Sequence, residues 1–433
     1  MSEKLPKRLF FTSLAFWIIS GVFAYGIAIG KFRIWPYELI EQVYIAAESL
    51  VQHGQIIPAN RVVKAPSNAS RERFIVYDAD NMSGGYYAFT GWDKEKHKYL
   101  AWLYNNRGDL LHVWEAKDSK IDPDSPLIAD KPPHPFSVLP DGSILVAFDH
   151  GNVMARLDYC GAPIWVKKGA YHHSLTRAQD GTYWTWRGNV FAYGHYNYLH
   201  NFDPETGTVI KEIGLVEDVI TKMGQNSAIF GVRPDFKFTR VEKVPKNHQN
   251  IDIFHPNDID VLLPEFANKF PLFEAGDLMI SLRKTHLVAV LDQNTYEVKW
   301  WSHAPWRFQH DPDFTKEGTI SVFSNNTGRR RSEIIQIDPS TMKFTNKLFD
   351  SEFRFYSASM GKHQYLPNDN VLIVIPGEGR AVELSSDGQR VMEFNNVVSE
   401  NHNAIVSNGI WLPPDYFDQT VALSSSLEND RCQ

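Results

Sequence analysis

One phrase recurs along most of the chain and constrains its fold more than any other feature. It consists of a histidine, a short apolar stretch, a turn rich in Asp, Asn or Gly, and a second apolar stretch. Copies begin at His134, His173, His310, His363 and His402, and His255 begins a copy (HPNDIDVL) whose second stretch, DLMISLR, follows an insertion. Short apolar runs broken by such turns are typical of β-strands. A repeat of this kind indicates a closed array of similar β-units.

A second phrase follows most copies of the first and adds two more strands, as in VLDQNTYEVKWW and QIDPSTMKFTNKL. Four strands make one blade of a propeller, and five complete blades are expected from residue 134 to about residue 394. The sixth is expected to combine HNAIVSNGIWL near the C-terminus with YYAFTGW, YLAWLYNN and LLHVWEA from the first part of the chain. This joint would close the ring and remove exposed sheet edges. Residues 73–433 are therefore predicted to form an all-β, six-bladed β-propeller.

The N-terminus predicts a membrane anchor. Residues 9–30 form an uncharged segment that is long enough to cross a bilayer as a helix. Lys4, Lys7 and Arg8 precede the span and favour a cytoplasmic N-terminus. The apolar run is longer than that of a signal peptide and no clear cleavage site follows. We therefore expect an uncleaved single-pass anchor in the inner membrane (residues 1–35), with the propeller facing the periplasm; a cleaved signal peptide is the alternative.

Residues 36–72 are expected to join the anchor to the propeller. Apolar residues recur at helical spacing in 36–55 and predict one amphipathic helix, followed by a polar linker. The net charge of −7 and the pI of about 6.1 exclude a basic nucleic-acid-binding surface. The two cysteines, Cys160 and Cys432, are expected to remain unpaired because Cys432 lies in a terminal tail.

The histidines of the repeat predict a functional site. Each begins the first strand of its blade, and in a propeller that strand lines the central channel. Six histidines at one equivalent position would form a ring at one mouth, where imidazole suits proton transfer near neutral pH or metal binding. Arginine is not a metal ligand, and Arg283 and the run Arg329, Arg330 and Arg331 favour an oxyanion such as sulfate or phosphate. Phe308 and Tyr365 are candidates for contact with a flat substrate.

The order of these motifs resembles the bacterial arylsulfate sulfotransferase family. The resemblance covers roughly residues 130–412 and is most specific in HPNDID and QHD. It implies an exported six-bladed propeller that moves a sulfuryl group from an aryl sulfate donor to a phenol acceptor through a sulfohistidine, with no cofactor and no metal. The implied catalytic residues are His363 as nucleophile, with His402 as a competitor, and His255, His310 and one of Arg329, Arg330 and Arg331. The implied substrate-binding residues are Asn257, Asp311, Arg283, Phe308, Tyr365 and His173, whereas His134 is expected to be structural.

Two other classes of function fit the same repeats. A scaffold propeller would hold a ligand at the histidines without chemistry. A metal- or quinone-dependent enzyme is suggested by phrases such as VLDQNTYEVKWW, although quinoprotein propellers usually have more blades than the six counted here.

Overall fold

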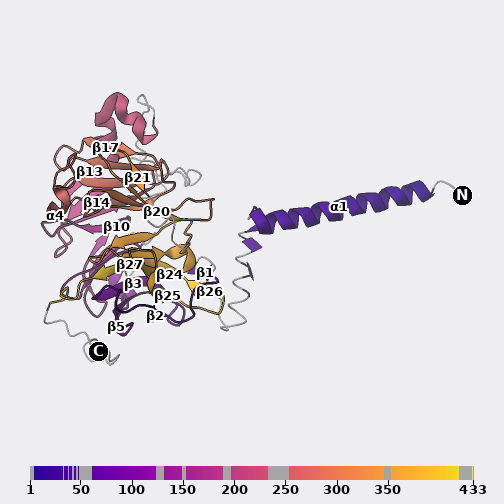
Figure 1. The fold of residues 1–433 in the computed structure, drawn as a ribbon, viewed down its shortest axis with the longest axis horizontal. Helices are drawn as coiled ribbons and strands as arrows, with labels where there is room; N and C mark the ends of the chain where they lie inside the picture. Colours follow the sequence, from indigo (N-terminus) through magenta and orange to yellow (C-terminus); the bar gives the residue numbers. More distant parts are fainter. Residues whose placement is uncertain are drawn as a thin grey trace. The chain divides into compact units, whose positions relative to one another are not determined.

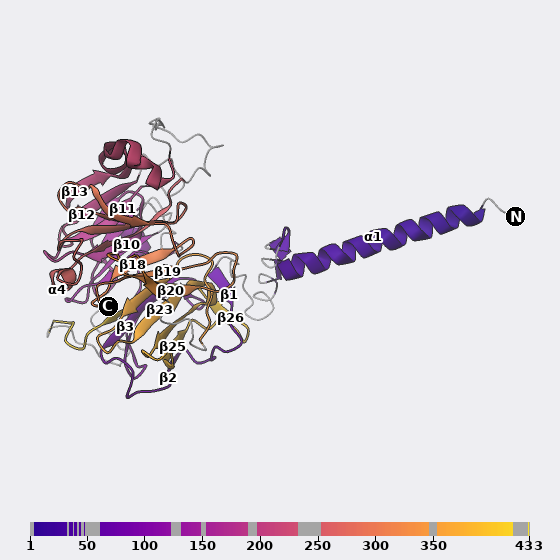
Figure 2. The same ribbon diagram turned by 45° about the horizontal axis from the view of Figure 1, so that its top comes forward.

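The computed structural model of the chain describes residues 4–32, 34–37, 39, 40, 43, 44, 47, 61–122, 131–148, 153–188, 197–232, 253–345, 353–418 and 432. The chain divides into one unit that ends at Val62 and a larger unit that begins at Val63. The larger unit is the predicted six-bladed β-propeller, drawn in Figures 1 and 2. The all-β fold class and the N-terminal apolar helix are both confirmed.

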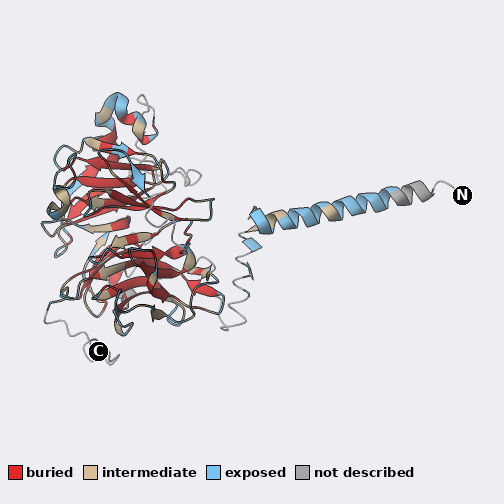
Figure 3. Cartoon of the chain, in the orientation of Figure 1, coloured by how far each residue is buried: buried red, intermediate tan, exposed pale blue. Residues whose placement is uncertain are grey.

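The first unit is dominated by α1 (Lys4–Phe32). Its segment Phe10–Phe32 is long and apolar enough to cross a membrane and is not buried against the rest of the chain. In Figure 3 the described part of α1 is almost entirely exposed, in contrast to the strands of the propeller. Of the amphipathic helix expected over 36–55, residue 36 lies in a turn and residues 37, 39, 40, 43, 44 and 47 are helical, while the others lie outside the described residues.

Five blades follow one another along the chain, each a four-stranded antiparallel meander. Blade 1 contains β6 (Phe136–Val138), β7 (Ile144–Phe148), β8 (Val153–Leu157) and β9 (Pro163–Lys168). Blade 2 contains β10 (Tyr171–Arg177), β11 (Tyr183–Arg187), β12 (Tyr198–Phe202) and β13 (Val209–Gly214). Blade 3 contains β14 (Pro256–Val261), β15 (Leu278–Leu282), β16 (Leu287–Leu291) and β17 (Val298–Ser302). Blade 4 contains β18 (His310–Phe314), β19 (Ile320–Ser324), β20 (Glu333–Ile337) and β21 (Phe344–Thr345). Blade 5 contains β22 (Lys362–Tyr365), β23 (Val371–Ile375), β24 (Arg380–Leu384) and β25 (Arg390–Asn395), and β2 (Phe74–Val76) adds a fifth strand to it.

Blade 6 closes the ring from both ends of the chain, as predicted. β27 (Val406–Leu412) pairs with β3 (Tyr86–Asp93), which continues to β4 (Lys98–Asn105) and β5 (Leu110–Trp114). Because three strands come from the N-terminal part, only one is needed from the C-terminal part.

One detail of the sixth blade was predicted wrongly. Asn408-Gly409 is not a turn but lies inside β27, where a Cβ on Gly409 would come within 2.6 Å of the Phe89 ring. Glycine here permits close packing rather than a reversal of the chain. His402 consequently lies before the innermost strand, on β26 (His402–Ala404), which pairs with β1 (Val62–Lys64). The larger unit thus starts ahead of the expected boundary at residue 73.

Apolar side chains fill the interfaces between blades. Among the described residues they form six clusters, and each cluster joins two neighbouring blades around the ring. Trp186 and Phe254 belong to the cluster between blades 2 and 3, and Trp306 to that between blades 3 and 4. The short helices are α3 (Asp118–Ile121), η4 (Leu215–Ile220), η5 (Thr221–Phe230), α4 (Pro264–Ala267) and η7 (Pro376–Glu378). Because apolar side chains occupy the interfaces between blades, polar side chains are expected to converge at the starts of the inner strands.

The cysteines form a disulfide between Cys160 and Cys432, so the expectation that they stay unpaired is wrong. The segment after β27 crosses from blade 6 onto blade 1. There the amide of Asp418 donates to the carbonyl of Pro140 at 2.9 Å, and Tyr416 Oη donates to the carbonyl of Val138 at 2.5 Å. These bonds lead the C-terminal end toward the blade that carries Cys160, a course that sequence spacing cannot show.

Replacing Cys432 with serine is expected to lower the free energy of unfolding by about 2–4 kcal/mol. The bridge closes a separation of 272 residues, so its loss releases a large constraint on the unfolded chain. Urea unfolding with and without a reductant would measure the change. Reductant should destabilise the natural chain to the level of the variant and leave the variant unaffected; equal sensitivity of both chains would contradict the expectation.

Candidate functional site

Five histidines from four blades meet at the start of the inner strands. The His173 ring lies with its centroid 5.0 Å from that of His134, 5.3 Å from that of His255 and 6.4 Å from that of His310. His172 completes the group, with its ring 5.0 Å from that of His173. We refer to His134, His172, His173, His255 and His310 as the histidine cluster. Four members of the expected ring of six are thus brought together, with His173 at the centre.

Irregular backbone places these rings. The register of β10 shifts between His172 and Thr176, and that of β14 shifts between Pro256 and Asp258. His173 and His255 have positive φ angles of 68° and 50°. Such a conformation costs about 1–3 kcal/mol in a residue other than glycine and is concentrated at functional sites. Adjacent residues in a regular strand point to opposite faces, so the irregularity also explains how His172, which the sequence did not suggest, joins the cluster.

His310 is held as a neutral imidazole in one tautomer. The amide of Met360 donates to His310 Nε2 at 3.3 Å, so this nitrogen carries no proton. Nδ1–H then donates to Asn325 Oδ1 at 2.7 Å, and Asn325 Nδ2 donates to the carbonyls of Ser357 and Met360. Burial and the nearby Arg283 guanidinium lower the pKa of His310 well below its usual value. Both ring nitrogens are therefore occupied.

His173 is also neutral near pH 7. Burial lowers its pKa well below the usual value, and the neighbouring His172 lowers it further. The Nδ1 atoms of His172 and His173 lie 2.8 Å apart, so one donates and the other accepts. His134, His172, His173 and His310 are buried, whereas His255 is only half-buried. A small molecule therefore reaches His255 most easily.

Arg283 is the arginine beside the cluster. Its backbone amide donates to the carbonyl of His255 at 3.1 Å, and its guanidinium lies 5.0 Å from the centre of the Phe308 ring. Phe308, half-buried with a φ of 51°, is fixed by its amide, which donates to His286 Nδ1 at 2.9 Å. A cation and an aromatic face thus lie at the entrance to the cluster, a combination suited to an anionic aryl compound.

The arginine run lies in the turn between β19 and β20. Arg329 and Arg330 are exposed, and Arg331 is half-buried with its Nε 3.9 Å from Glu333. The same turn is tied to the loop that covers His310, because Thr327 Oγ1 donates to the carbonyl of Ala358. Arg283 Nη2 donates to that carbonyl as well, at 3.4 Å.

His363 occupies a different environment from the cluster. Its Nδ1 lies 3.0 Å from Asp311 Oδ2, its backbone amide also donates to that oxygen, and its Nε2 lies 2.6 Å from Ser321 Oγ. The side chain is completely buried. In register it faces Ile373 in the middle of β23, whereas His310 begins its strand opposite Phe323. The order Asp311–His363–Ser321 has the connectivity of a hydrolase triad, but Ser321 is fully buried and offers no surface to a substrate.

A lysine lies at the centre of the carboxylates around His363. Lys362 Nζ lies 2.6 Å from Asp311 Oδ1 and 2.9 Å from Asp258 Oδ1. Although burial alone would raise the pKa of Asp311, Lys362 and His363 lower it to about 2. Burial raises the pKa of Asp258 to about 8 against the attraction of Lys362. Burial and the negative charge of Asp311 raise the pKa of Asp313 well above its usual value.

Asp311, Asp313 and His363 also offer donor atoms within 4.8 Å of one another, which is the geometry of a metal-binding group. The Lys362 ammonium already supplies a positive charge to this group, bound to Asp311. Among the described residues, this is the one group of at least three His, Cys, Asp or Glu side chains whose donor atoms all lie within 4.8 Å of one another.

The motifs that carry the family resemblance bind one another across blades 3, 4 and 5. In HPNDID, Asn257 Nδ2 donates to the carbonyl of Gln309 at 2.7 Å, and Asp260 Oδ2 accepts from the amide of Phe314. In QHD, Gln309 Nε2 donates to the carbonyls of Leu282 and Leu287. The motifs therefore hold His255 and His310 in position relative to each other.

The remaining expected site residues lie away from the cluster. Tyr365 packs edge-on against His363 at 5.9 Å rather than against His173 or His255. His402 Nδ1 lies 3.4 Å from Ser399 Oγ, and the carbonyl of His402 accepts from Arg71.

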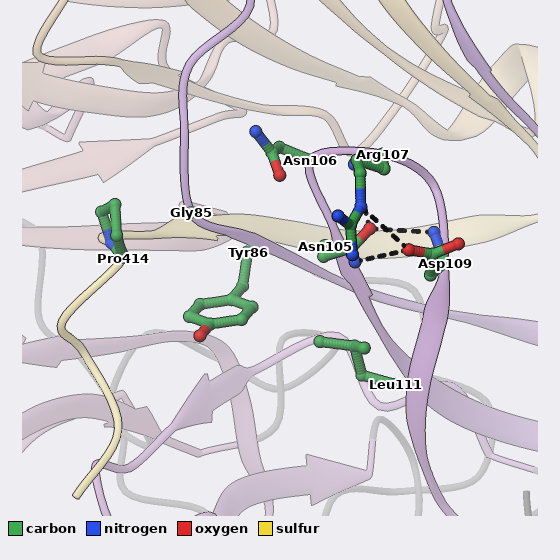
Figure 4. Close-up of a pocket in the computed structure, with 8 residues that line it drawn as sticks. All are labelled: Gly85, Tyr86, Asn105, Asn106, Arg107, Asp109, Leu111 and Pro414. Carbon is green, nitrogen blue, oxygen red and sulfur yellow. Dashed lines mark hydrogen bonds and ion pairs between the residues drawn. The ribbon is translucent and has the colours of Figure 1, made fainter. Parts of the chain in front are cut away.

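Two cavities that are lined by described residues lie away from the histidine cluster. One cavity of about 430 Å³ lies at the turn between β4 and β5, where Tyr86 and Leu111 face Asn105, Arg107 and Asp109 (Figure 4). Its polar groups bond to one another, since Asn105 Nδ2 and Arg107 Nε both donate to Asp109 Oδ2. A second cavity of about 650 Å³ lies between the turns of blades 1 and 2 and includes Arg156 and Arg177. The candidate site is therefore identified by the convergence of the histidines and not by either of these two cavities.

A six-bladed propeller with clustered histidines and an arginine at one mouth defines a class of protein with a polar site in its central channel. Within that class, the chain matches the family model described as arylsulfotransferase (ASST) over residues 136–397, which is more than half of its length, so the chain belongs to the arylsulfotransferase family. The match runs from blade 1 through blade 5 and ends before His402. Membership of this family and the fold together support a sulfotransferase-type propeller enzyme.

Solved structures resemble the chain at low identity. A Bacteroides caccae protein of unknown function is 12% identical with a TM-score of 0.46, and the match covers 75% of this chain and 99% of that one. The Dos1 propeller is 9% identical with a TM-score of 0.39, over 78% and 76% of the two chains. Virginiamycin B lyase from Staphylococcus aureus is 9% identical with a TM-score of 0.37, over 74% and 87%. No curated protein is similar enough to count as a relative.

Proposed function

We propose that the chain transfers a sulfuryl group from an aryl sulfate ester to a phenol at the histidine cluster, with His255 as the nucleophile. The observation that carries the proposal is the position of half-buried His255, beside buried neutral imidazoles and next to Arg283. The resemblance assigns the nucleophile to His363. The His363 side chain is fully buried, and both of its ring nitrogens contact other side chains. We therefore favour His255 as the nucleophile.

The reaction takes place in two steps that exchange one bond each. A neutral imidazole nitrogen of His255 attacks sulfur, the ester S–O bond breaks, and the phenolate leaves with the bonding electrons. The acceptor phenol then attacks the sulfohistidine, the N–S bond breaks, and the electrons return to the imidazole. The phenol proton passes to a neighbouring imidazole, for which neutral His173 is suited because it can both accept and donate.

Charge on the transferred group requires a cation. Sulfuryl transfer resembles phosphoryl transfer, with a loose transition state and negative charge on the non-bridging oxygens. Arg283 is placed to bind these oxygens. Its guanidinium lies over the Phe308 ring, and Phe308 offers an aromatic contact to the aryl group of the substrate. The donor is itself an ester, so no nucleotide donor enters the scheme.

The proposed location is the periplasmic side of the inner membrane, with α1 as an uncleaved anchor. The three basic residues ahead of the span favour an N-terminus in the cytoplasm. The Cys160–Cys432 disulfide supports an oxidising compartment for the propeller.

The proposal is tested with the full chain in detergent, a chromogenic aryl sulfate and a phenol. Release of the coloured phenolate should accelerate with added phenol, and the sulfated acceptor should appear in equal amount. Absence of the sulfated acceptor over a panel of phenols would overturn the proposal.

The choice among arginines gives a separate prediction. Arg283→Met is expected to reduce kcat/KM by about 10²–10³-fold, as when one stabilising donor is removed from a transition state. Arg329→Met serves as a matched control, since Arg329 is exposed in its turn, and should change kcat/KM little. Steady-state kinetics of the two variants decide the matter, and a larger loss for Arg329→Met would restore the arginine run as the oxyanion site.

A further inference from the structure

The chain that follows α1 exposes an apolar helical face. The described residues between Tyr37 and Ala47 are helical, and four large side chains among them are more than half exposed. These are Leu39 (58%), Ile40 (53%), Val43 (63%) and Tyr44 (61%). Residues three and four apart lie on one face of a helix, so the four form a continuous apolar stripe. We call these residues the apolar stripe.

The sequence between these residues has the opposite character. Two acidic residues, Glu38 and Glu41, occur next to them in the sequence. A helix with a large apolar face and a charged face is stable at a boundary between an apolar and an aqueous phase. Water on all sides would leave the stripe exposed.

The position of the stripe in the chain indicates which boundary this is. Residues 33–36 separate α1 from the helical residues and can span no more than about 14 Å. Tyr25 Oη donates to the carbonyl of Trp35 at 2.7 Å, which draws this connection back toward α1. Trp35 itself is 80% exposed, and tryptophan is enriched where helices leave the bilayer. If α1 crosses a membrane, the bond between Tyr25 and Trp35 keeps the start of the stripe close to the interfacial layer of that membrane, which is about 5–7 Å thick.

We propose that the helical residues from Tyr37 to Ala47 form an interfacial helix whose apolar stripe lies in the surface of the membrane that α1 crosses. The helical residues begin with Tyr37, directly after Pro36, and proline is favoured at a helix start because its missing N–H needs no partner there. The amides of Tyr37 and Ile40 donate to the carbonyls of Ile34 and Pro36, which starts the helix directly after the connection. The occupant of the stripe is lipid. This proposal is independent of the sulfuryl transfer.

Site-directed spin labelling of the full chain tests the proposal. Both native cysteines are in the disulfide, so a cysteine introduced at one position is labelled alone under non-reducing conditions. Ile40→Cys and Val43→Cys place labels on the stripe, and Glu38→Cys and Glu41→Cys are the matched controls. Each labelled chain is placed in nanodiscs of phosphatidylethanolamine and phosphatidylglycerol, and its collisions with oxygen and with a water-soluble nickel chelate are measured.

Labels at positions 40 and 43 are expected to collide severalfold more with oxygen than with the chelate, and labels at 38 and 41 are expected to show the reverse. Equal access of the chelate to all four labels would overturn the proposal. Intact mass must show that the N-terminal segment is retained; cleavage before Trp35 would remove the anchor and contradict the proposal. A Leu39→Glu, Val43→Glu double variant should lose the oxygen preference at a label on position 40.

Discussion

Replacing His255 with asparagine is expected to lower the rate of sulfuryl transfer by about 10⁴-fold or more, the size of loss that follows removal of a catalytic nucleophile. The reason is that His255 is the half-buried member of the histidine cluster, whereas His310 is occupied at both ring nitrogens. Steady-state turnover of a chromogenic aryl sulfate measures the loss, and the urea midpoint verifies that the variant is folded.

Two further variants make this result specific. His402→Asn should retain most of the activity, because His402 lies on β26 outside the inner strands. His255→Gly should recover part of its activity with added imidazole, since a small molecule can reach the vacated position; a purely structural role would not give such rescue. If His363→Asn abolishes transfer while His255→Asn does not, the nucleophile is His363 and the assignment by accessibility is wrong.

The largest expected effect on stability comes from Lys362. Lys362→Met should lower the free energy of unfolding by about 3–5 kcal/mol at neutral pH, because it leaves Asp311 as a buried carboxylate without its cation and removes the ion pair with Asp258. The matched control is Lys316→Met. Lys316 pairs with Asp369 at the surface, and such a pair contributes about 0–1 kcal/mol.

The destabilisation by Lys362→Met should depend on pH in a defined direction. In the natural chain the pKa of Asp311 is about 2, below its unfolded value near 3.8, so this group stabilises the fold above pH 4 and loses that effect as the pH falls toward 2. The variant lacks this stabilisation, so Asp311 must either take up a proton or remain a buried carboxylate without a cation. The difference between the two chains should therefore be largest at neutral pH and shrink toward pH 4. Urea unfolding at several pH values measures it, and a difference that grows as the pH falls would contradict the account.

The fold was predictable from the sequence because its repeat is regular. Apolar runs separated by turn residues define the strands of blades 1 to 5. The strands left over at the two ends of the chain complete a blade only when they pair with each other. The error in blade 6 arose because Asn-Gly is a common turn signal, whereas Gly409 is needed for close contact with Phe89 on the adjacent strand β3. The Cys160–Cys432 bridge was missed for a similar reason, since it depends on the course of the tail over blade 1.

The candidate site was predictable only in part. The histidine phrases pointed to His173, His255 and His310, which the structure brings together, and Arg283 was named beside them. Equal positions in a repeat do not imply equal positions in space, however. Shifts of register in β10, β14 and β18 turn their histidines toward one point, whereas β22 pairs without a shift and directs His363 toward Asp311 and Ser321. His172 was missed because the sequence of a strand does not show where its register shifts. Lys362 was missed because the sequence does not show which side chains of other blades it pairs with.

The most direct test of the central claim is to locate the covalent intermediate. The full chain is exposed to an aryl sulfate without acceptor, digested under conditions that preserve the N–S bond, and mapped by mass spectrometry. The account predicts a sulfuryl group on the peptide that contains His255, lost on addition of a phenol. A sulfuryl group on the peptide with His363 or His402 instead, or none while transfer proceeds, would contradict it.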